Sequence, residues 1–317
     1  MSASAPAPPS PPSPPGGAPR TLWLLTDGKP GHRSQLEGLA RALAALTPTA
    51  IHWIEAPPPV AALKALARRR FPPGADLPAP DLIACCGHAT HLPALAARRA
   101  RGGRLVALMK PSLPLACFDL CVIPQHDAPP AGDKVIATRG VLNTARPDGA
   151  READRGLILI GGPSKHFGWD EAGLLAQLED ILAATPAMRW TLTTSRRTPA
   201  STEAALEPLR ARGLDLRPFR DTAPGWAMQE LARSAEAWVS EDSVSMVYES
   251  LSAGAATGLL AVPRLARSRV SEGVAMLIAD GLVTPFAAWQ TSHRLTPPPT
   301  PLAEADRVAR EILRRWG

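Results

Sequence analysis

Short apolar runs alternate with helical stretches along almost the whole of this 317-residue chain. Strands of the buried type are predicted at 21–26, 51–55, 81–85, 104–109, 120–123 and 134–137. Helices are predicted between the first four strands, at 34–46, 60–70 and 88–101. Because strands that alternate with helices form parallel sheets covered on both faces, the sequence predicts an α/β fold.

The alternation is interrupted by a polar, turn-rich segment at 143–155, which we take as a domain boundary. Further strands are predicted at 156–160, 189–193, 214–219, 237–239 and 257–262, and further helices at 170–184, 198–213, 224–234 and 243–253. The chain length also favours two domains. We therefore expect two Rossmann-like, doubly wound parallel-sheet domains, at 21–145 and 156–296.

The segment at 302–317 predicts one more helix, with an apolar stripe along one face. The stripe consists of Ala305, Val308, Ala309, Ile312, Leu313 and Trp316. This helix either packs on the second domain or crosses back to brace the first one.

The composition excludes several classes of protein. The chain is 45% hydrophobic and 20% charged, as in ordinary globular proteins, and no apolar run approaches the roughly 18 residues of a membrane span. The segment at 1–20 consists almost entirely of Ala, Pro, Ser and Gly, which predicts a disordered tail. It has neither the basic region nor the apolar core of a secretory signal. Four cysteines are too few for a disulfide framework, so we expect reduced thiols and a cytoplasmic protein.

The net charge of +6 lies entirely in the first half of the chain. Residues 1–150 contain 16 Lys and Arg against 9 Asp and Glu, whereas the rest is close to neutral. Such a surplus suits a phosphorylated ligand or an anionic membrane surface. No nucleic acid is expected, because no basic run is interleaved with aromatic residues. The basic helix at 60–70 either lies on an anionic bilayer or packs its apolar side internally.

The first candidate site follows the first strand, at 27–35, where ligands bind in open parallel sheets. Glycines let the backbone approach a ligand, and a helix N-terminus with cationic side chains attracts anions. The candidate binding residues are Gly28, Lys29, Gly31, Arg33 and Gln35. His32 titrates near neutrality and is the candidate general base. A tight turn with solvated charges is the alternative.

Three loops of the second domain carry similar chemistry. Glycines, hydroxyl groups and cationic side chains that follow strands suit a diphosphate, whereas simple turns and helix caps are the alternatives. The candidate residues are Gly161, Gly162, Ser164, Lys165, Ser195, Arg196, Arg197, Asp242, Ser243, Ser245 and Glu249. The carboxylate of Glu249 could accept hydrogen bonds from a ribose diol, and a buried or ion-paired Glu is the alternative.

A zinc site is the weaker interpretation of the cysteines and nearby histidines. The residues concerned are Cys85, Cys86, Cys117, Cys121, His88 and His91. Adjacent strand residues point to opposite faces, so core cysteines are expected and no metal site is assigned. His88 is retained as a candidate binding residue because it follows a strand.

The motifs TDGKPGHRSQ, IGGPSKHFGWD, TTSRRTP and SEDSVSMVYES resemble those of the mitochondrial-fission "elongated mitochondria" (Elm) family, in its bacterial branch. The resemblance covers about residues 21–289 and implies a GT-B fold, with two Rossmann-like domains facing a cleft. Plant members recruit a dynamin-related protein, which implies an adaptor as one alternative. Bacterial members are often labelled nucleotide-sugar epimerases, but the chain has no GxGxxG motif and no Tyr-x-x-x-Lys motif.

A more distant resemblance is to the GT-B transferase that adds N-acetylglucosamine to the peptidoglycan lipid precursor. Gly31-His32 and the Ser243…Glu249 stretch correspond to its first loop and to its ribose-binding helix. The resemblance implies a metal-independent glycosyltransferase with a nucleotide-sugar donor and no cofactor. A lipid-linked acceptor would place the protein peripherally at the inner membrane. An NAD-independent epimerase is a further alternative.

Overall fold

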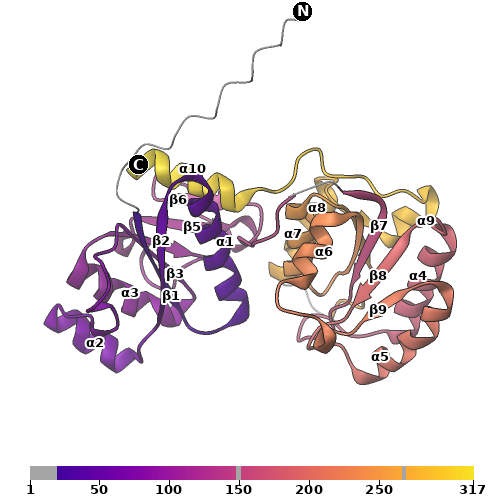
Figure 1. Cartoon of the computed structure of the whole chain (residues 1–317), viewed down its shortest axis with the longest axis horizontal. Coiled ribbons are helices and arrows are strands. Elements are labelled where there is room, and N and C mark those ends of the chain that lie inside the picture. The colour runs from indigo at the N-terminus through magenta and orange to yellow at the C-terminus, as the bar shows by residue number, and fades with distance from the viewer. Residues whose placement is uncertain (1–19, 148–150, 266–268) are drawn as a thin grey trace, which may run out of the picture.

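The computed structural model describes residues 20–147, 151–265 and 269–317 (Figure 1). It contains two domains, each built on a six-stranded parallel sheet with helices on both faces. The expected α/β fold with two doubly wound domains is confirmed. The tail expected at 1–20 lies outside the described residues, apart from Arg20, which begins the first strand.

The first sheet has the strand order β2-β1-β3-β4-β5-β6. Its strands are β1 (Arg20–Thr26), β2 (Thr49–Glu55), β3 (Leu82–Cys86), β4 (Arg104–Leu108), β5 (Leu120–Pro124) and β6 (Val135–Thr138). The helices between them are α1 (Pro30–Leu46), α2 (Pro59–Arg68) and α3 (His88–Arg101). Side chains of β1 alternate between the faces: Leu24 packs in the core under α1, and Trp23 in the core under α3.

The second sheet has the strand order β12-β11-β10-β7-β8-β9. Its strands are β7 (Glu152–Leu159), β8 (Arg189–Thr193), β9 (Asp215–Arg217), β10 (Ser234–Ser240), β11 (Ala256–Leu260) and β12 (Thr284–Pro285). The helices are α4 (Glu171–Ala184), α5 (Ala200–Leu206), α6 (Trp226–Arg233), α7 (Val244–Ala253), α8 (Arg269–Ala279) and α9 (Phe286–Ser292). One core lies between the sheet and α6, α7 and α8, and another between the sheet and α4, α5 and α9.

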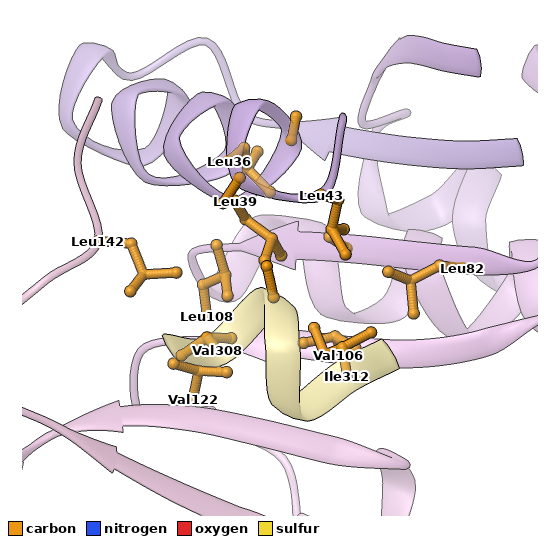
Figure 2. Packing of buried hydrophobic residues seen from close by; sticks show 14 of the residues in the cluster. Leu36, Leu39, Leu43, Leu82, Val106, Leu108, Val122, Leu142, Val308 and Ile312 are labelled. Carbon is orange, nitrogen blue, oxygen red and sulfur yellow. The ribbon is translucent and has the colours of Figure 1, made fainter. Parts of the chain in front are cut away.

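The last helix, α10 (Glu304–Trp316), packs on the first domain although it follows the second in sequence (Figure 1). Val308, Ala309 and Ile312 are buried in the same core as Leu39 of α1. Figure 2 shows α10 beside α1, with Val308 and Ile312 among the leucines and valines of this core. The face that the apolar stripe predicts is therefore the face that the helix buries.

Several element boundaries differ from those expected, each for a local reason. The first helix begins at Pro30 and not near residue 34, because proline is well suited to the first helical position. The helix expected at 198–213 ends as an α-helix at Leu206 and continues as a 3-10 helix that contains Pro208. Strand β7 begins at Glu152, inside the segment taken as the domain boundary.

Both sheets reverse their strand order at one point, which is where ligands bind in doubly wound folds. In the first sheet the reversal lies between β1 and β3, and in the second between β7 and β10. His32 and His88 lie in the first helical turns after β1 and β3, and Gly161 and Asp242 lie in the loops after β7 and β10. The topology therefore places the candidate residues at two switch points, one in each domain.

The domains contact each other through loops that follow β5 and β6. The ring of His126 stacks on that of Tyr248 of α7, with 6.5 Å between the centroids. A Cβ atom on Gly140 would lie 2.4 Å from the Tyr248 ring. Asn143, part of the expected boundary segment, is buried and donates from Nδ2 to Oγ of Ser252 at 3.0 Å. The carboxyl edge of the first sheet thus abuts the second domain.

Candidate functional site

At the switch point of the first sheet, Asp27 and His32 form a hydrogen-bonded pair. Asp27 directly follows β1, His32 lies in the first turn of α1, and the Nδ1 atom of His32 is 2.9 Å from Oδ1 of Asp27. Burial raises the pKa of Asp27, but the bonds from His32 and the Lys29 N–H outweigh it, so the pKa lies below 3.8. An ionised carboxylate only accepts, so Nδ1 carries the proton and Nε2 is left as the basic nitrogen.

The pair is enclosed by Gly87, which precedes α3. A Cβ atom on Gly87 would lie 2.5 Å from the His32 ring and 3.1 Å from Oδ2 of Asp27. Its φ of +90° also favours glycine. Asp27 and Gly87, which surround the candidate base, are not among the site residues expected from the sequence. A carboxylate five residues before the candidate base was the available signal for Asp27, whereas nothing local marked Gly87.

The remaining candidates of the first loop have separate contacts. Lys29 is 59% exposed and lies 3.4 Å from Asp27. The guanidinium of Arg33 lies over the ring of Trp53 on β2, at 4.3 Å from its centroid. Gln35 is buried and donates to the carbonyl of Gly31. These contacts hold the first turn of α1 in place. The N–H of Gly28 donates to Thr26, and Gly28 has φ +78° with open space around it.

Histidines of α3 lie close to this pair. His88 is exposed at the start of the helix, whereas His91 is buried and its Nδ1 lies 3.1 Å from Oγ of Ser112. Burial, with smaller effects of His88 and His32, lowers the pKa of His91 to about 4. His91 is therefore neutral near pH 7, and His88 is the α3 histidine that solvent reaches.

The zinc alternative does not hold. Cys85 and Cys121 belong to the core under α3, whereas Cys86 belongs to the core under α1, so a sheet separates them. Burial raises the pKa of Cys85 to about 12 and that of Cys121 to about 11, which favours thiols over thiolates. Across the described ranges, no group of three His, Cys, Asp or Glu side chains is arranged to hold a metal ion.

In the second domain, Asp242 links the loops at the switch point. Its Oδ2 accepts from the N–H of Gly162 at 2.9 Å and from Nη2 of Arg197 at 2.7 Å. The N–H of Gly161 donates to Ser240 at 2.7 Å. The two glycine N–H groups that we expected near a diphosphate thus have partners within the protein. A Cβ atom on Gly161 would lie 2.1 Å from Asp242, so close packing requires this glycine.

The neighbouring candidates also stabilise loops. Ser195 donates from Oγ to the carbonyl of Gly161 at 3.0 Å, and Arg197 donates to the carbonyl of Gly162. Ser164 accepts from the N–H of Phe167 at 3.2 Å, closing a turn. Lys165 is exposed, and no hydrogen bond or ion pair involves its side chain in the described part of the chain.

A pocket of about 480 Å³ opens at the carboxyl ends of β7 and β8, between α6 and α7. Apolar side chains form much of its wall, and Arg196 and Glu249 are the candidates that line it. The guanidinium of Arg196 lies 5.4 Å from the ring centroid of Phe219 and, among described residues, forms no ion pair. The full set of lining residues is Leu159, Thr193, Thr194, Arg196, Phe219, Arg220, Thr222, Ala223, Pro224, Gly225, Ala227, Met228, Met246 and Glu249.

Glu249 is the acidic group of this pocket. It is half-buried, and within the described residues no hydrogen bond or ion pair holds its carboxylate. Burial raises its pKa from 4.5 to about 7. An unpaired carboxylate of this kind is suited to accept hydrogen bonds from a ligand.

The first turn of α7 lies beside Glu249. Ser243 is the N-cap residue, yet its side chain forms no capping bond, and Ser245 is exposed one residue before the pocket residue Met246. The N–H groups of a first helical turn have no partners within the helix, and the positive end of the helix dipole favours anions. Sequence reasoning missed the apolar wall, including Phe219 and Met246, because distant segments assemble it.

Two doubly wound domains with polar residues at both switch points define a GT-B-type protein. The chain belongs to the mitochondrial fission ELM1 family, whose profile matches residues 30–316. This confirms the resemblance drawn from the motifs. No curated protein matches the chain.

Solved structures of the same fold are similar over nearly the whole chain. MurG of Acinetobacter baumannii is 15% identical with a TM-score of 0.50, and the match covers 92% of this chain and 95% of that protein. A putative UDP-N-acetylglucosamine 2-epimerase of Listeria monocytogenes is 11% identical with a TM-score of 0.60, covering 94% and 97%. The UDP-GlcNAc 2-epimerase of Neisseria meningitidis, bound to UDP-GlcNAc, is 13% identical with a TM-score of 0.50, covering 93% and 100%. These likenesses support the GT-B fold.

No helix among the described residues has the length and apolar character that crossing a bilayer requires.

Proposed function

We propose that this protein is a GT-B-type glycosyltransferase that uses a nucleotide-sugar donor and needs neither a metal ion nor another cofactor. The observation that carries the proposal is the pocket of the second domain, where the Glu249 carboxylate lies among apolar side chains and has no partner among the described residues. Such a pocket suits a nucleoside, with the base against the apolar wall and the ribose hydroxyls donating to Glu249. The UDP-GlcNAc named for the Neisseria epimerase structure supports a nucleotide-sugar as the ligand class.

The donor diphosphate would lie at the first turn of α7, next to the nucleoside. Arg196 lines the pocket and has no carboxylate partner in the part of the chain that the structure describes, whereas Arg197 is paired with Asp242. Charge develops on the diphosphate as the sugar leaves, so the guanidinium and the helix N–H groups would stabilise the transition state. Positive charge from these groups would substitute for a metal ion.

The acceptor would bind at the first domain, where His32 serves as general base. Asp27 holds Nδ1 of the imidazole, so Nε2 can take the proton of an acceptor hydroxyl as its oxygen attacks the anomeric carbon. The bond from that carbon to the diphosphate oxygen then breaks, and the nucleoside diphosphate leaves. This step requires the two switch points to face each other across a cleft.

The acceptor class that the surface favours is a lipid-linked intermediate of the cell envelope. On α2, Val60 is 67% exposed and Leu63 is 59% exposed, and the same segment carries Lys64, Arg68 and Arg69 without any acidic residue. Exposed apolar side chains beside basic ones favour the surface of an anionic bilayer. A cytoplasmic protein bound peripherally at the inner membrane would meet such an acceptor.

A calorimetric titration with UDP, GDP, ADP and CMP, and with the corresponding sugars, tests the donor site. One nucleotide should bind, and Glu249→Ala should weaken it roughly tenfold or more, since a hydrogen bond to a charged group contributes about 1.5–3 kcal/mol. Glu207→Ala, at an exposed carboxylate away from the pocket, is the matched control. No binding by any nucleotide, or unchanged binding in Glu249→Ala, would refute the donor site.

An adaptor without transfer activity is the second candidate. The observation in its favour is that the N–H groups of Gly161 and Gly162 are already bonded to Ser240 and Asp242. An adaptor would function normally after His32→Ala and would retain a protein partner. An NAD-independent epimerase would instead isomerise the donor sugar without an acceptor.

A further inference from the structure

A second pocket lies at the amino edge of the first sheet, at the end of the strands opposite to His32. Its volume is about 310 Å³, and the first residues of β1, the residue before β3, the start of β4 and the last turn of α10 line it. It takes no part in the donor and acceptor sites considered above. The full lining is Arg20, Thr21, Leu22, Leu43, Thr49, Asp81, Leu82, Arg104, Ile312, Leu313, Arg315, Trp316 and Gly317.

One wall of this pocket is apolar, and polar and charged side chains line the rest. Leu22, Leu43, Leu82 and Ile312 belong to the buried core under α1, and the partly buried indole of Trp316 packs against the same core. A cavity of this size is at the lower end of small-molecule sites, and it holds a chain of about eight carbons more readily than a nucleotide. The apolar wall therefore suits a short alkyl or aryl body.

Two guanidinium groups lie around Trp316. Arg20 donates from Nη1 to the Trp316 carbonyl at 3.0 Å, and the Arg104 guanidinium lies 5.6 Å from the centroid of the Trp316 ring. A guanidinium has five N–H donors, so these contacts leave most of them available. Arg315, in contrast, is committed to Glu311 and to the carbonyl of Asp133.

The carboxylates of the pocket do not neutralise these two arginines by direct contact. Asp81 accepts the N–H of Thr21 at 2.8 Å, and in the described ranges it pairs with no arginine. Arg20 likewise forms no ion pair with a carboxylate among the described residues. Within the described ranges, the one ion pair of Arg104 is a 3.9 Å contact with Asp119, a residue that Arg98 approaches more closely, at 3.3 Å. Two cationic groups beside an apolar wall complement a ligand with one anionic end and one apolar end.

We propose that this pocket binds a small amphiphilic anion, with its carboxylate or phosphate between Arg20 and Arg104 and its apolar body against Trp316. The ligand would touch β1, β4 and α10 together. Its binding would therefore stabilise the docking of α10 on the first domain, by linkage between binding and folding.

Titration calorimetry on the full-length protein tests the site with octyl phosphate and octanoate below their micellar concentrations. Both should bind saturably, one per chain, and raise the melting temperature. Three control compounds should bind at least about tenfold more weakly than octyl phosphate. Octanol and octyltrimethylammonium lack the negative charge, and inorganic phosphate lacks the alkyl chain. Saturating nucleotide should not compete, because the donor pocket lies in the other domain.

The variants Arg20→Ala and Arg104→Ala should each weaken the binding of octyl phosphate about tenfold or more. Arg310→Ala is the matched control, because it also removes one positive charge from α10. Arg310 lines a different pocket, outside the proposed site. Arg104 is 58% exposed, so its variant keeps the test valid if Arg20→Ala fails to fold. Equal affinity for octyltrimethylammonium, or equal effects of Arg104→Ala and Arg310→Ala, would overturn the proposal.

Discussion

The Nδ1 atom of His32 lies 2.9 Å from Oδ1 of Asp27, so the first residue after β1 fixes the imidazole in the first turn of α1. The side chain of Asp27 is 7% exposed and that of His32 is 20% exposed. The carboxylate is thus largely shielded, while the histidine keeps contact with solvent.

Replacing this carboxylate by an amide should destabilise the protein. We expect Asp27→Asn to lower the free energy of unfolding by about 1–2 kcal/mol at pH 7, through loss of a charge-assisted hydrogen bond. Because the folded pKa of Asp27 is depressed, its contribution is present above pH 3.8 and is lost as the pH falls through the folded value. Urea titrations from pH 3 to 8 measure this, with the exposed Asp76→Asn as control. If the difference in unfolding free energy between Asp27→Asn and the parent protein does not change with pH, the charged hydrogen bond from Asp27 to His32 is contradicted.

The raised pKa of Glu249 predicts a pH effect of opposite sign. The folded state holds this proton more tightly than the unfolded chain, so stability falls as the pH rises from 4.5 to about 7 and then levels off. Glu249→Gln should therefore be more stable than the parent protein by about 1–3 kcal/mol at pH 8 and equal to it below pH 4.5. Thermal unfolding across this range gives the comparison. A destabilised variant at pH 8 would show that a partner already compensates the carboxylate.

Removal of the two adjacent arginines, Arg196 and Arg197, should have different effects on the protein. Arg197→Ala leaves the Asp242 carboxylate, whose side chain is 0% exposed, without its ion pair and should cost about 2–3 kcal/mol of stability. Arg196→Ala should leave stability within about 0.5 kcal/mol and weaken nucleotide binding roughly tenfold. Denaturant unfolding and calorimetry on both variants separate the two roles. If Arg196→Ala lowers the unfolding free energy as much as Arg197→Ala does, Arg196 also has a structural role.

Two glycines with positive φ provide a matched pair. Gly28→Ala adds a methyl group to open space, so only backbone strain of about 1–2 kcal/mol is expected. Gly87→Ala adds a methyl group 2.5 Å from the His32 ring. It should therefore lower the stability more than Gly28→Ala does, and it should displace the imidazole. Histidine NMR signals report the displacement of His32. Unchanged His32 signals in Gly87→Ala would mean that the backbone moves instead.

The sequence predicts the fold well where its signals are local. The helix expected at 88–101 has those bounds in the structure, because Gly87 and Gly102 flank it. The strands β1 to β11 are expected from the sequence, most of them because they are apolar runs. The two-residue strand β12 and the helices α8 and α9 are not expected, and β12 in particular has no apolar run to mark it. The expected start of α1 near residue 34 is too late, because Pro30 takes the first helical position although the glycines around it indicate a loop.

The candidate site is harder to predict, because it depends on distant residues. Nothing in the sequence separates Arg196 from Arg197, since the difference arises from Asp242, 45 residues further on. Likewise, Gly161 resembles a phosphate-binding glycine, but its N–H is bonded to Ser240. Pairings of this kind exist only once the strands are assembled.

The return of α10 to the first domain has a consequence for folding during synthesis. Val308 and Ile312 fill the core beneath α1, so that core stays incomplete until the ribosome has made almost the whole chain. The second domain has all its strands by Pro285 and can form earlier. The domain that emerges first is therefore the one completed last, which reverses the usual N-terminal-first order.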